Sequence, residues 1–216
     1  FYTSGTTGRP KGVEITHANL VAMTQCFLSD VEGIAPGDAI LHPAPLSHGS
    51  GLYAVPHVAR AAVNVVPASG GFDPAEIADL VGAWDRALFF AAPTMVKRLV
   101  EHPSIGRANL GRLKSVVYGG GPMYVEDAKA AFAALGPRLA QIYGQGESPM
   151  TITVLTADEH MDDHDGRRLE RLGSVGRAQV GVEVTVLDER GRAVPSGSIG
   201  EVCVRGDTVM AGYLGN

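Results

Sequence analysis

The first twelve residues combine glycines, hydroxyl side chains and one lysine, which suits the binding of phosphate. Glycine lets the backbone adopt positive φ and approach a ligand closely, and successive N–H groups in such a loop can bind an anion. The segment differs from a Walker A loop, because Pro10 disfavours helix at Arg9 and no Ser or Thr follows Lys11. A flexible linker is the alternative on composition, but the Pro-Lys-Gly ending leads into an amphipathic helix. The glycines are Gly5, Gly8 and Gly12, and the hydroxyl donors are Thr3, Ser4, Thr6 and Thr7.

Two more glycine-rich motifs follow segments that we expect to be strands. Residues 119–122 read Gly-Gly-Gly-Pro, and residues 143–147 read Tyr-Gly-Gln-Gly-Glu. Ligands of open parallel sheets bind beyond the carboxyl ends of the strands, so we expect both motifs to border the same crevice as the first loop. A flat group could lie against the glycines, with the tyrosine as a stacking face and the glutamate as a ligand for Mg²⁺. Taken alone, these two motifs fit a tight turn and a solvated acid equally well.

The three motifs, in this order, resemble those of the adenylate-forming (AMP-binding) superfamily, which includes acyl-CoA synthetases, adenylation domains of nonribosomal peptide synthetases and beetle luciferases. The most specific match lies over residues 2–12, where Tyr-Thr-Ser-Gly-Thr-Thr-Gly-Arg-Pro-Lys-Gly is similar to the signature loop. Residues 45–51, Pro-Leu-Ser-His-Gly-Ser-Gly, favour the branch of acyl-CoA synthetases and fatty-acid–CoA ligases. The resemblance covers nearly the whole chain and implies part of the large N-terminal domain of such an enzyme.

The resemblance implies a role for each motif. In the family, the loop holds the β- and γ-phosphates of ATP, the glycine turn and the aromatic residue enclose the adenine, and the glutamate binds the bridging Mg²⁺. Lys11 and Glu147 are therefore the implied catalytic residues, with Glu147 the metal ligand, and His48 and Gly119 are placed at the acyl pocket. Gly146 stands where the family usually has threonine, so a hydroxyl contact near the α-phosphate is missing. The implied nucleotide-binding residues are Thr3, Ser4, Gly5, Thr6, Thr7, Gly8, Lys11, Gly120, Gly121, Pro122, Tyr143, Gly144 and Gly146.

The implied activity is that of an AMP-forming acid–thiol ligase. A carboxylate, here expected to be a fatty acid, attacks the α-phosphate of Mg-ATP to give acyl-adenylate and pyrophosphate, and coenzyme A then displaces AMP. Two alternatives stay open. An aryl- or amino-acid-activating domain would carry a polar or charged anchor in its acyl pocket, and a catalytically degenerate nucleotide-binding module would tolerate Gly146. The sequence fixes neither the acyl chain length nor whether coenzyme A or a carrier protein is the acceptor.

An α/β fold must position these motifs. Up to about residue 147 short apolar strands alternate with helices, and fully apolar strands such as 87–92 are typical of a mostly parallel sheet that is covered on both faces. Strands are expected over 39–44, 62–67, 87–92, 113–118 and 139–143, and helices from Thr16 to about Asp30 and over 51–61, 73–83, 93–101 and 125–135.

The pattern changes after Glu147, where strands follow one another without helices and predict a small antiparallel β module. The charged residues 158–171 are expected to form a surface loop, and Met210-Ala211-Gly212-Tyr213 resembles a family motif of architectural character. The strands of the module are expected over 151–155, 182–187 and 199–204, in a chain divided into an α/β nucleotide-binding subdomain (1–150), a connecting segment (151–172) and a β-rich subdomain that starts a distorted barrel (173–216).

Composition excludes several classes of protein. The net charge of −5 and the lack of a basic cluster argue against a nucleic-acid partner. No apolar run approaches the roughly 20 residues of a membrane span, and no signal peptide opens the chain, so we expect a cytoplasmic protein. Cys26 and Cys203 are expected to be reduced and buried. Residues 162–165, Asp-Asp-His-Asp, fit a solvated acidic loop better than a metal site, because consecutive side chains cannot converge on one ion.

The chain begins inside its most informative motif, which suggests a piece of a longer protein. The resemblance implies that the N-terminal half of the large domain, a ribose-binding aspartate and a C-terminal domain with a catalytic lysine lie elsewhere. The isolated chain is therefore expected to have little or no ligase activity. It should also expose apolar surface where the missing half docks, unless it forms a homodimer.

Overall fold

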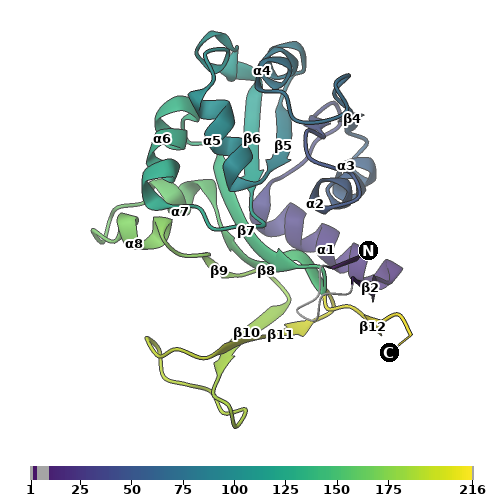
Figure 1. Ribbon diagram of the computed structural model, residues 1–216, viewed down its shortest axis with the longest axis vertical. Helices are drawn as coiled ribbons and strands as arrows, with labels where there is room; N and C mark the ends of the chain where they lie inside the picture. Colours follow the sequence, from purple (N-terminus) through teal and green to yellow (C-terminus); the bar gives the residue numbers. More distant parts are fainter. Residues whose placement is uncertain (1, 4–9, 216) are drawn as a thin grey trace.

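A mixed seven-stranded sheet forms the centre of the computed structural model, which describes residues 2–3 and 10–215 (Figure 1). Its strand order is β4-β3-β5-β6-β7-β8-β9, in which the first five strands run parallel and β8 and β9 each run antiparallel to the strand before them. Every residue of β5 is buried, as expected for a strand with apolar cover on both faces. The strands are β3 (Ala39–Leu41), β4 (Val63–Val65), β5 (Ala87–Ala91), β6 (Leu113–Tyr118), β7 (Leu139–Gln145), β8 (Ser148–Leu155) and β9 (Arg177–Ala178).

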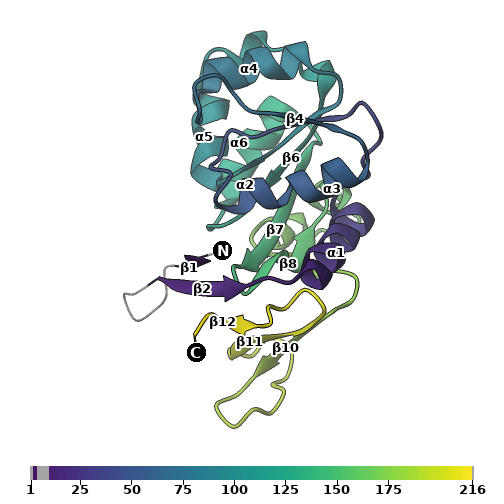
Figure 2. The same cartoon turned by 90° about the vertical axis from the view of Figure 1, so that its right-hand side faces the viewer.

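Helices pack on both faces of this sheet (Figures 1 and 2). On one face Phe89 of β5 belongs to an apolar cluster with residues of α4, α5 and α6, and on the other Phe90 packs with residues of α1 and with Tyr53 between α2 and α3. The Asp73 carboxylate caps α4 by accepting hydrogen bonds from the backbone N–H groups of Ala75 and Glu76. The helices here are α1 (His17–Cys26) with its π-helical extension (Phe27–Val31), α2 (Gly49–Leu52), α3 (Ala54–Ala59), α4 (Pro74–Ala83), α5 (Pro93–Glu101), α6 (Val125–Leu135) and two 3₁₀ turns (Ile105–Arg107 and Leu110–Arg112).

Residues from the two ends of the described chain meet in a second, three-stranded sheet. β2 (Lys11–Glu14) pairs antiparallel with β1 (Tyr2–Thr3) and with β12 (Gly212–Tyr213). A separate antiparallel hairpin joins β10 (Val182–Leu187) and β11 (Glu201–Gly206). Figure 2 shows both small sheets next to the end of the large sheet where β7 and β8 meet. This arrangement brings the two strands that flank the first loop, β1 and β2, into one sheet with the last strand, β12.

The fold class is confirmed, since a mostly parallel sheet is flanked by helices and accompanied by small antiparallel sheets. One detail of the antiparallel part was wrong. The strand expected over 151–155 is present as β8, but it pairs with β7 and β9 inside the large sheet and not with β10 or β11. A β-branched run suits both kinds of sheet, so its pairing partner could not be read from the sequence. The proposed division into three segments remains a prediction.

The surface loop expected over 158–171 was also wrong, because the segment contains α7 (Ala157–Met161) and α8 (Arg168–Leu172). Thr156 and Glu159 form a capping box that starts α7. His160 is fully buried, where it accepts a hydrogen bond from the Tyr118 hydroxyl at 2.8 Å and donates to the carbonyl oxygen of Thr156 at 2.7 Å. Burial lowers the pKa of His160 to about 4, so the ring is neutral at pH 7.

Three further findings bear on the sequence predictions. The helix expected over 51–61 is divided into α2 and α3 at Tyr53, which fits Pro56 in the first turn of α3, where proline is tolerated. Both cysteines are free, but only Cys26 is buried, whereas Cys203 is half-buried. Within the described residues, no helix has both the length and the apolar character needed to cross a membrane.

Candidate functional site

Glu147 lies in the turn between β7 and β8, where it contacts both ends of the described chain. Its Oε1 accepts a hydrogen bond from the Tyr213 hydroxyl at 2.7 Å and lies 3.5 Å from the Thr3 hydroxyl, at the outer limit of a hydrogen bond. Its carbonyl oxygen accepts from the N–H of Met210 at 2.8 Å. The hydrogen bond to Glu147 raises the pKa of Tyr213. Glu147 is thus held by Tyr213 of β12 and by Met210 before this strand, and Thr3 of β1 lies next to it.

Lys11 belongs to the same cluster. It begins β2 opposite Thr3, and its ammonium nitrogen lies 4.9 Å from the centre of the Tyr213 ring, in cation–π geometry. Sequence reasoning therefore placed Thr3, Lys11 and Glu147 at one site but treated Tyr213 as architectural. The other predicted loop residues, Ser4, Gly5, Thr6, Thr7 and Gly8, lie outside the described residues.

Among its described residues, this cluster contains a single carboxylate that could bind a metal ion, that of Glu147. Within the described residues, no group of three or more His, Cys, Asp or Glu side chains could hold a metal ion. Mg²⁺ in nucleotide sites keeps several waters and is bound through one or two carboxylates together with substrate phosphates. The half-buried carboxylate of Glu147 therefore fits a magnesium ion that arrives with a nucleotide, and it does not fit a resident metal centre.

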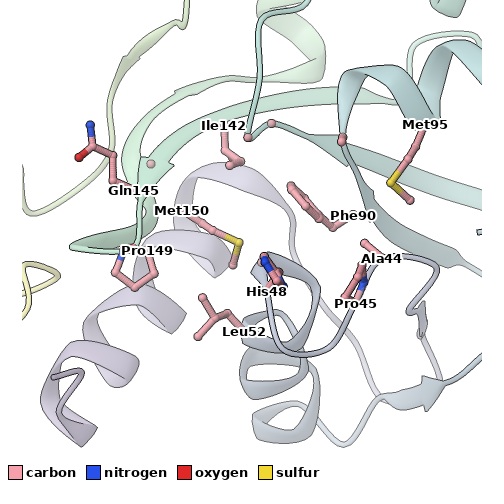
Figure 3. A pocket seen from close by; sticks show the side chains of 16 residues that line it. Ala44, Pro45, His48, Leu52, Phe90, Met95, Ile142, Gln145, Pro149 and Met150 are labelled. Atoms are coloured by element: carbon pink, nitrogen blue, oxygen red, sulfur yellow. The ribbon is translucent and has the colours of Figure 1, made fainter. Parts of the chain in front are cut away.

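A cavity of about 350 Å³ opens beside the strand ends, and we call it the apolar cavity (Figure 3). It contains both residues predicted for the acyl pocket, His48 and Gly119. Among the described residues that line it, only His48 and Gln145 have polar side chains. No described lining residue carries a carboxylate, an ammonium or a guanidinium group. His48 itself is exposed, with its Nδ1 3.1 Å from the Ser47 hydroxyl oxygen. The apolar wall is made mainly by Ala44, Leu52, Phe90, Met95, Ile142 and Met150.

A second cavity of about 390 Å³, the glycine cavity, borders the same strand ends. Its lining contains four of the predicted adenine-site residues, Gly120, Gly121, Pro122 and Tyr143, together with Gly144. Tyr143 is half-buried, and its hydroxyl accepts a hydrogen bond from the side-chain amide of Gln145 at 3.1 Å. The two cavities share Gly120, Ile142 and Gly144, so they meet where β6 and β7 end.

Close approach of two backbones explains two of the glycines between the cavities. A Cβ at Gly119 would lie 2.4 Å from the carbonyl oxygen of Ile142, and a Cβ at Gly144 would lie 2.4 Å from the amide nitrogen of Met150. Gly120 has a φ of +79°, which favours glycine for a different reason. Gly146 lines the apolar cavity directly before Glu147, so this position offers no side-chain hydroxyl to a ligand.

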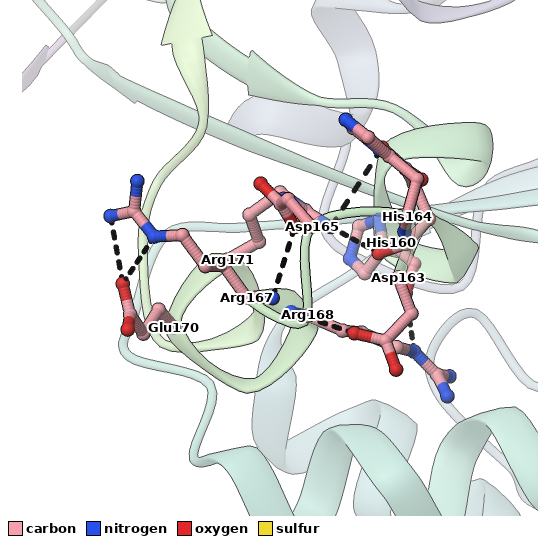
Figure 4. Close-up of polar contacts among 9 residues, drawn as sticks. His160, Asp163, His164, Asp165, Arg167, Arg168, Glu170 and Arg171 are labelled. Carbon is pink, nitrogen blue, oxygen red and sulfur yellow. Dashed lines mark hydrogen bonds and ion pairs between the residues drawn. The ribbon is translucent and has the colours of Figure 1, made fainter.

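The acidic segment 162–165 is tied up in local contacts and does not form a site (Figure 4). The Asp162 carboxylate pairs with the His164 ring at 2.6 Å, which raises the pKa of His164. Asp165 pairs with Arg171 at 2.8 Å, and Asp163 accepts from the backbone N–H of Arg168 at 3.3 Å. These contacts point in different directions and stabilise the start of α8.

Comparison with known proteins supports the same interpretation. A family model described as AMP-binding enzyme matches residues 1–214. The medium/long-chain-fatty-acid–CoA ligase FadD8 of Mycobacterium tuberculosis is 36% identical over 212 residues, which cover 98% of this chain and 35% of that protein. A feruloyl-CoA synthase of an Amycolatopsis species is 31% identical over 216 residues, which cover 99% of this chain and 42% of that protein.

Among solved structures, the amide bond synthetase McbA from Marinactinospora thermotolerans superimposes with a TM-score of 0.87 and 34% identity, over 98% of this chain and 41% of that one. The fold is that of the adenylate-forming enzymes. The chain belongs to the AMP-binding enzyme family, in the group that contains fatty-acid–CoA ligases and related acyl-CoA synthetases. It spans 35% to 42% of the lengths of these relatives.

Proposed function

We propose that this chain is the central part of an enzyme that activates an apolar carboxylic acid with ATP and passes the acyl group to coenzyme A. The observation that carries the proposal is the meeting of the two cavities at Gly120, Ile142 and Gly144. An acid in the apolar cavity and a nucleotide in the glycine cavity would bring a carboxylate and a phosphate chain together at that point. Holding two reactants in contact is the main demand of phosphoryl chemistry on a protein.

The first step forms a bond between a carboxylate oxygen and the α-phosphorus of ATP and breaks the bond from that phosphorus to pyrophosphate. We assign Tyr143 and the glycine turn to the adenine. Thr3, Lys11 and the loop residues Ser4 to Gly8 are assigned to the β- and γ-phosphates that leave. Mg²⁺ bound through Glu147 would offset the negative charge that grows on the departing phosphates.

In the second step the sulfur of coenzyme A attacks the acyl carbon and AMP leaves. The relatives differ in the acceptor of the acyl group, since their names include CoA ligases and an amide bond synthetase. Coenzyme A as the acceptor in this protein is therefore our proposal. The isolated chain is expected to be inactive, and the activity belongs to the complete protein. A cytoplasmic location and a homodimer remain predictions.

The lining of the apolar cavity favours a fatty acid. An amino acid would bring an ammonium group that needs a carboxylate partner, and the described lining offers none. An aryl acid is the second candidate, because Phe90 presents an aromatic ring to the cavity.

Acid-dependent exchange between ATP and pyrophosphate in the complete protein tests the proposal, with fatty, aryl and amino acids as substrates. Lys11→Ala and Glu147→Ala should each lower exchange by about 10²-fold or more, because each removes charge stabilisation at the phosphates. Lys97→Ala, which breaks an exposed ion pair with Asp127 on the helices, is the matched control and should leave exchange unchanged. ATP binding without exchange for any acid would replace this proposal with the nucleotide-binding module.

A further inference from the structure

The antiparallel pair of β7 and β8 is interrupted next to the apolar cavity. Tyr143 pairs with Thr153 and Gln145 pairs with Ser148, so Gly144 alone lies opposite residues 149–152. Extra residues of this kind bend a strand and redirect its side chains, and they are common beside functional sites. Here the bulge carries Pro149 and Met150 into the lining of the apolar cavity.

Met150 has an unusual backbone conformation within this bulge. Its φ is +61°, in the left-handed region that a residue with a long side chain seldom adopts. Its side chain is 8% exposed, and a Cβ at Gly49 would lie 3.4 Å from the Met150 sulfur and 3.2 Å from the Phe90 ring. Figure 3 shows Met150 between Ile142 and His48 at the wall of the cavity. Such strained conformations persist only where their surroundings hold them.

Gln179 is the side chain that holds the bulge. Its amide nitrogen donates to the carbonyl oxygen of Met150 at 3.0 Å and to that of Thr153 at 3.1 Å. Its backbone N–H donates to the carbonyl oxygen of Ile152 at 3.2 Å. Gln179 is 2% exposed and follows β9, so a residue outside the cavity fastens three backbone positions of β8.

Behind Met150 lies a small space of about 10 Å³. Three buried polar atoms of residues that line it have no protein partner among the described residues: the Tyr53 hydroxyl, the Thr151 hydroxyl and the side-chain oxygen of Gln179. This volume and these atoms suit one bound water molecule. Met150 lines both this space and the apolar cavity, so it stands between the three unpaired polar atoms and the cavity.

We propose that Gln179 is a positioning residue for the acid substrate, because it holds Met150 in the conformation that shapes the apolar cavity. The inference rests on the proposed function, since it takes the apolar cavity as the acid site. It assigns acid selectivity to a side chain that does not itself line this cavity. Loss of the two amide hydrogen bonds would let Met150 leave the left-handed region and move the cavity wall.

Exchange kinetics in the complete protein test this role. Gln179→Met keeps a similar volume and removes both hydrogen bonds, and it should raise the KM for the preferred acid about tenfold while changing the KM for ATP by less than about twofold. Asn19→Leu is the matched control, because Asn19 is a buried amide that also donates to two carbonyls, those of Asp207 and Val209. That variant should lower stability without changing the order of preference among acids.

A second substitution separates positioning from simple stabilisation. Glycine adopts positive φ without a steric penalty, so Met150→Gly removes the strain that Gln179 opposes. In that background Gln179→Met should change the acid KM by less than about twofold. Equal effects of Gln179→Met in both backgrounds, or an unchanged acid KM in the first, would overturn the inference.

Two outcomes keep this test distinct from that of the proposed function. If the unsubstituted protein catalyses exchange and the variants keep the same acid preference, the role of Gln179 is refuted and the proposed function stands. No exchange with any acid in the unsubstituted protein refutes the proposed function and this inference with it. If Gln179→Met does not fold, Gln179→Asn replaces it, because asparagine keeps the amide on a side chain that is one methylene shorter. This variant should shift acid preference in the same direction. An unchanged preference would refute the positioning role of Gln179.

Discussion

Gly119 and Gly121 belong to the same glycine turn, but the structure predicts opposite tolerance to alanine. A Cβ at Gly119 would lie 2.4 Å from the carbonyl oxygen of Ile142 and 2.6 Å from its Cδ1. Contacts of a Cβ below 3.0 Å are essentially never observed, so the ends of β6 and β7 would have to separate by about 0.6 Å. A Cβ at Gly121 would meet nothing closer than Pro93 Cδ at 3.8 Å, and Gly121 is exposed.

Overpacking of this kind costs about 1–3 kcal/mol, so we expect Gly119→Ala to lower the free energy of unfolding by about 2 kcal/mol. Because Gly119 lines the apolar cavity and the adjoining strand ends line both cavities, the KM values for acid and for ATP should both rise. Urea unfolding and exchange kinetics of the complete protein measure the two effects, with Gly121→Ala expected to lie within about 0.5 kcal/mol of the unsubstituted protein. Equal stability of the two variants would refute the argument from backbone contact.

Three further substitutions test other parts of the structure. His160 is neutral when folded but has an ordinary pKa of 6.5 when unfolded, so it should make the free energy of unfolding fall by about 1.4 kcal/mol per pH unit from about pH 6 toward pH 4. In urea unfolding at several pH values, His160→Gln should lose this contribution to the slope. An unchanged slope would contradict the assignment. Asp38 is buried, yet hydrogen bonds from Lys114 at 2.6 Å and from Arg86 outweigh burial and lower its pKa, so its contribution to stability is present above its unfolded pKa of 3.8 and is lost below it. Lys114→Met should therefore cost about 3 kcal/mol at pH 7 in the same assay, and a change below about 1 kcal/mol would refute the burial argument. Tyr213→Phe keeps the ring beside Lys11 but loses the hydrogen bond to Glu147. It should therefore raise the KM for Mg-ATP by about three- to tenfold and leave the KM for the acid unchanged. An unaltered KM for Mg-ATP would show that Tyr213 has no part in the site.

The sequence was sufficient where local chemistry decides the structure. Asp73 followed by Pro74 predicted the start of α4, and the apolar run of β5 predicted a strand covered on both faces. It was insufficient where distant segments decide. The capping box of Thr156 and Glu159 is a local signal for α7, but the burial of His160 against Tyr118 and Phe132, from distant segments, cannot be read from the local sequence.

The candidate site follows the same division. The sequence predicted that the motifs at residues 119–122 and 143–147 border one crevice, and residues of both motifs line the two adjoining cavities. The role of these motifs in nucleotide binding stays a prediction. The contribution of Tyr213 could not be predicted, since it depends on the pairing of β12 with β2 across the length of the chain. The bulge at Met150 and its support by Gln179 were equally hidden, because neither residue type signals a positive φ or a backbone contact.

Backbone and side chains form different parts of the proposed acid site. The boundary between the cavities is formed by Gly120 and Gly144 together with Ile142, so main chain occupies most of the place where the two substrates would meet. A side chain at Gly144 would collide with the backbone of the bulge, and one at Gly120 would require a strained φ. The reacting end of the site is therefore constrained by the fold, whereas the far wall at Met150 is made of side chains. Under the proposed function, we expect substitutions at that wall to change acid selectivity without moving the carboxylate.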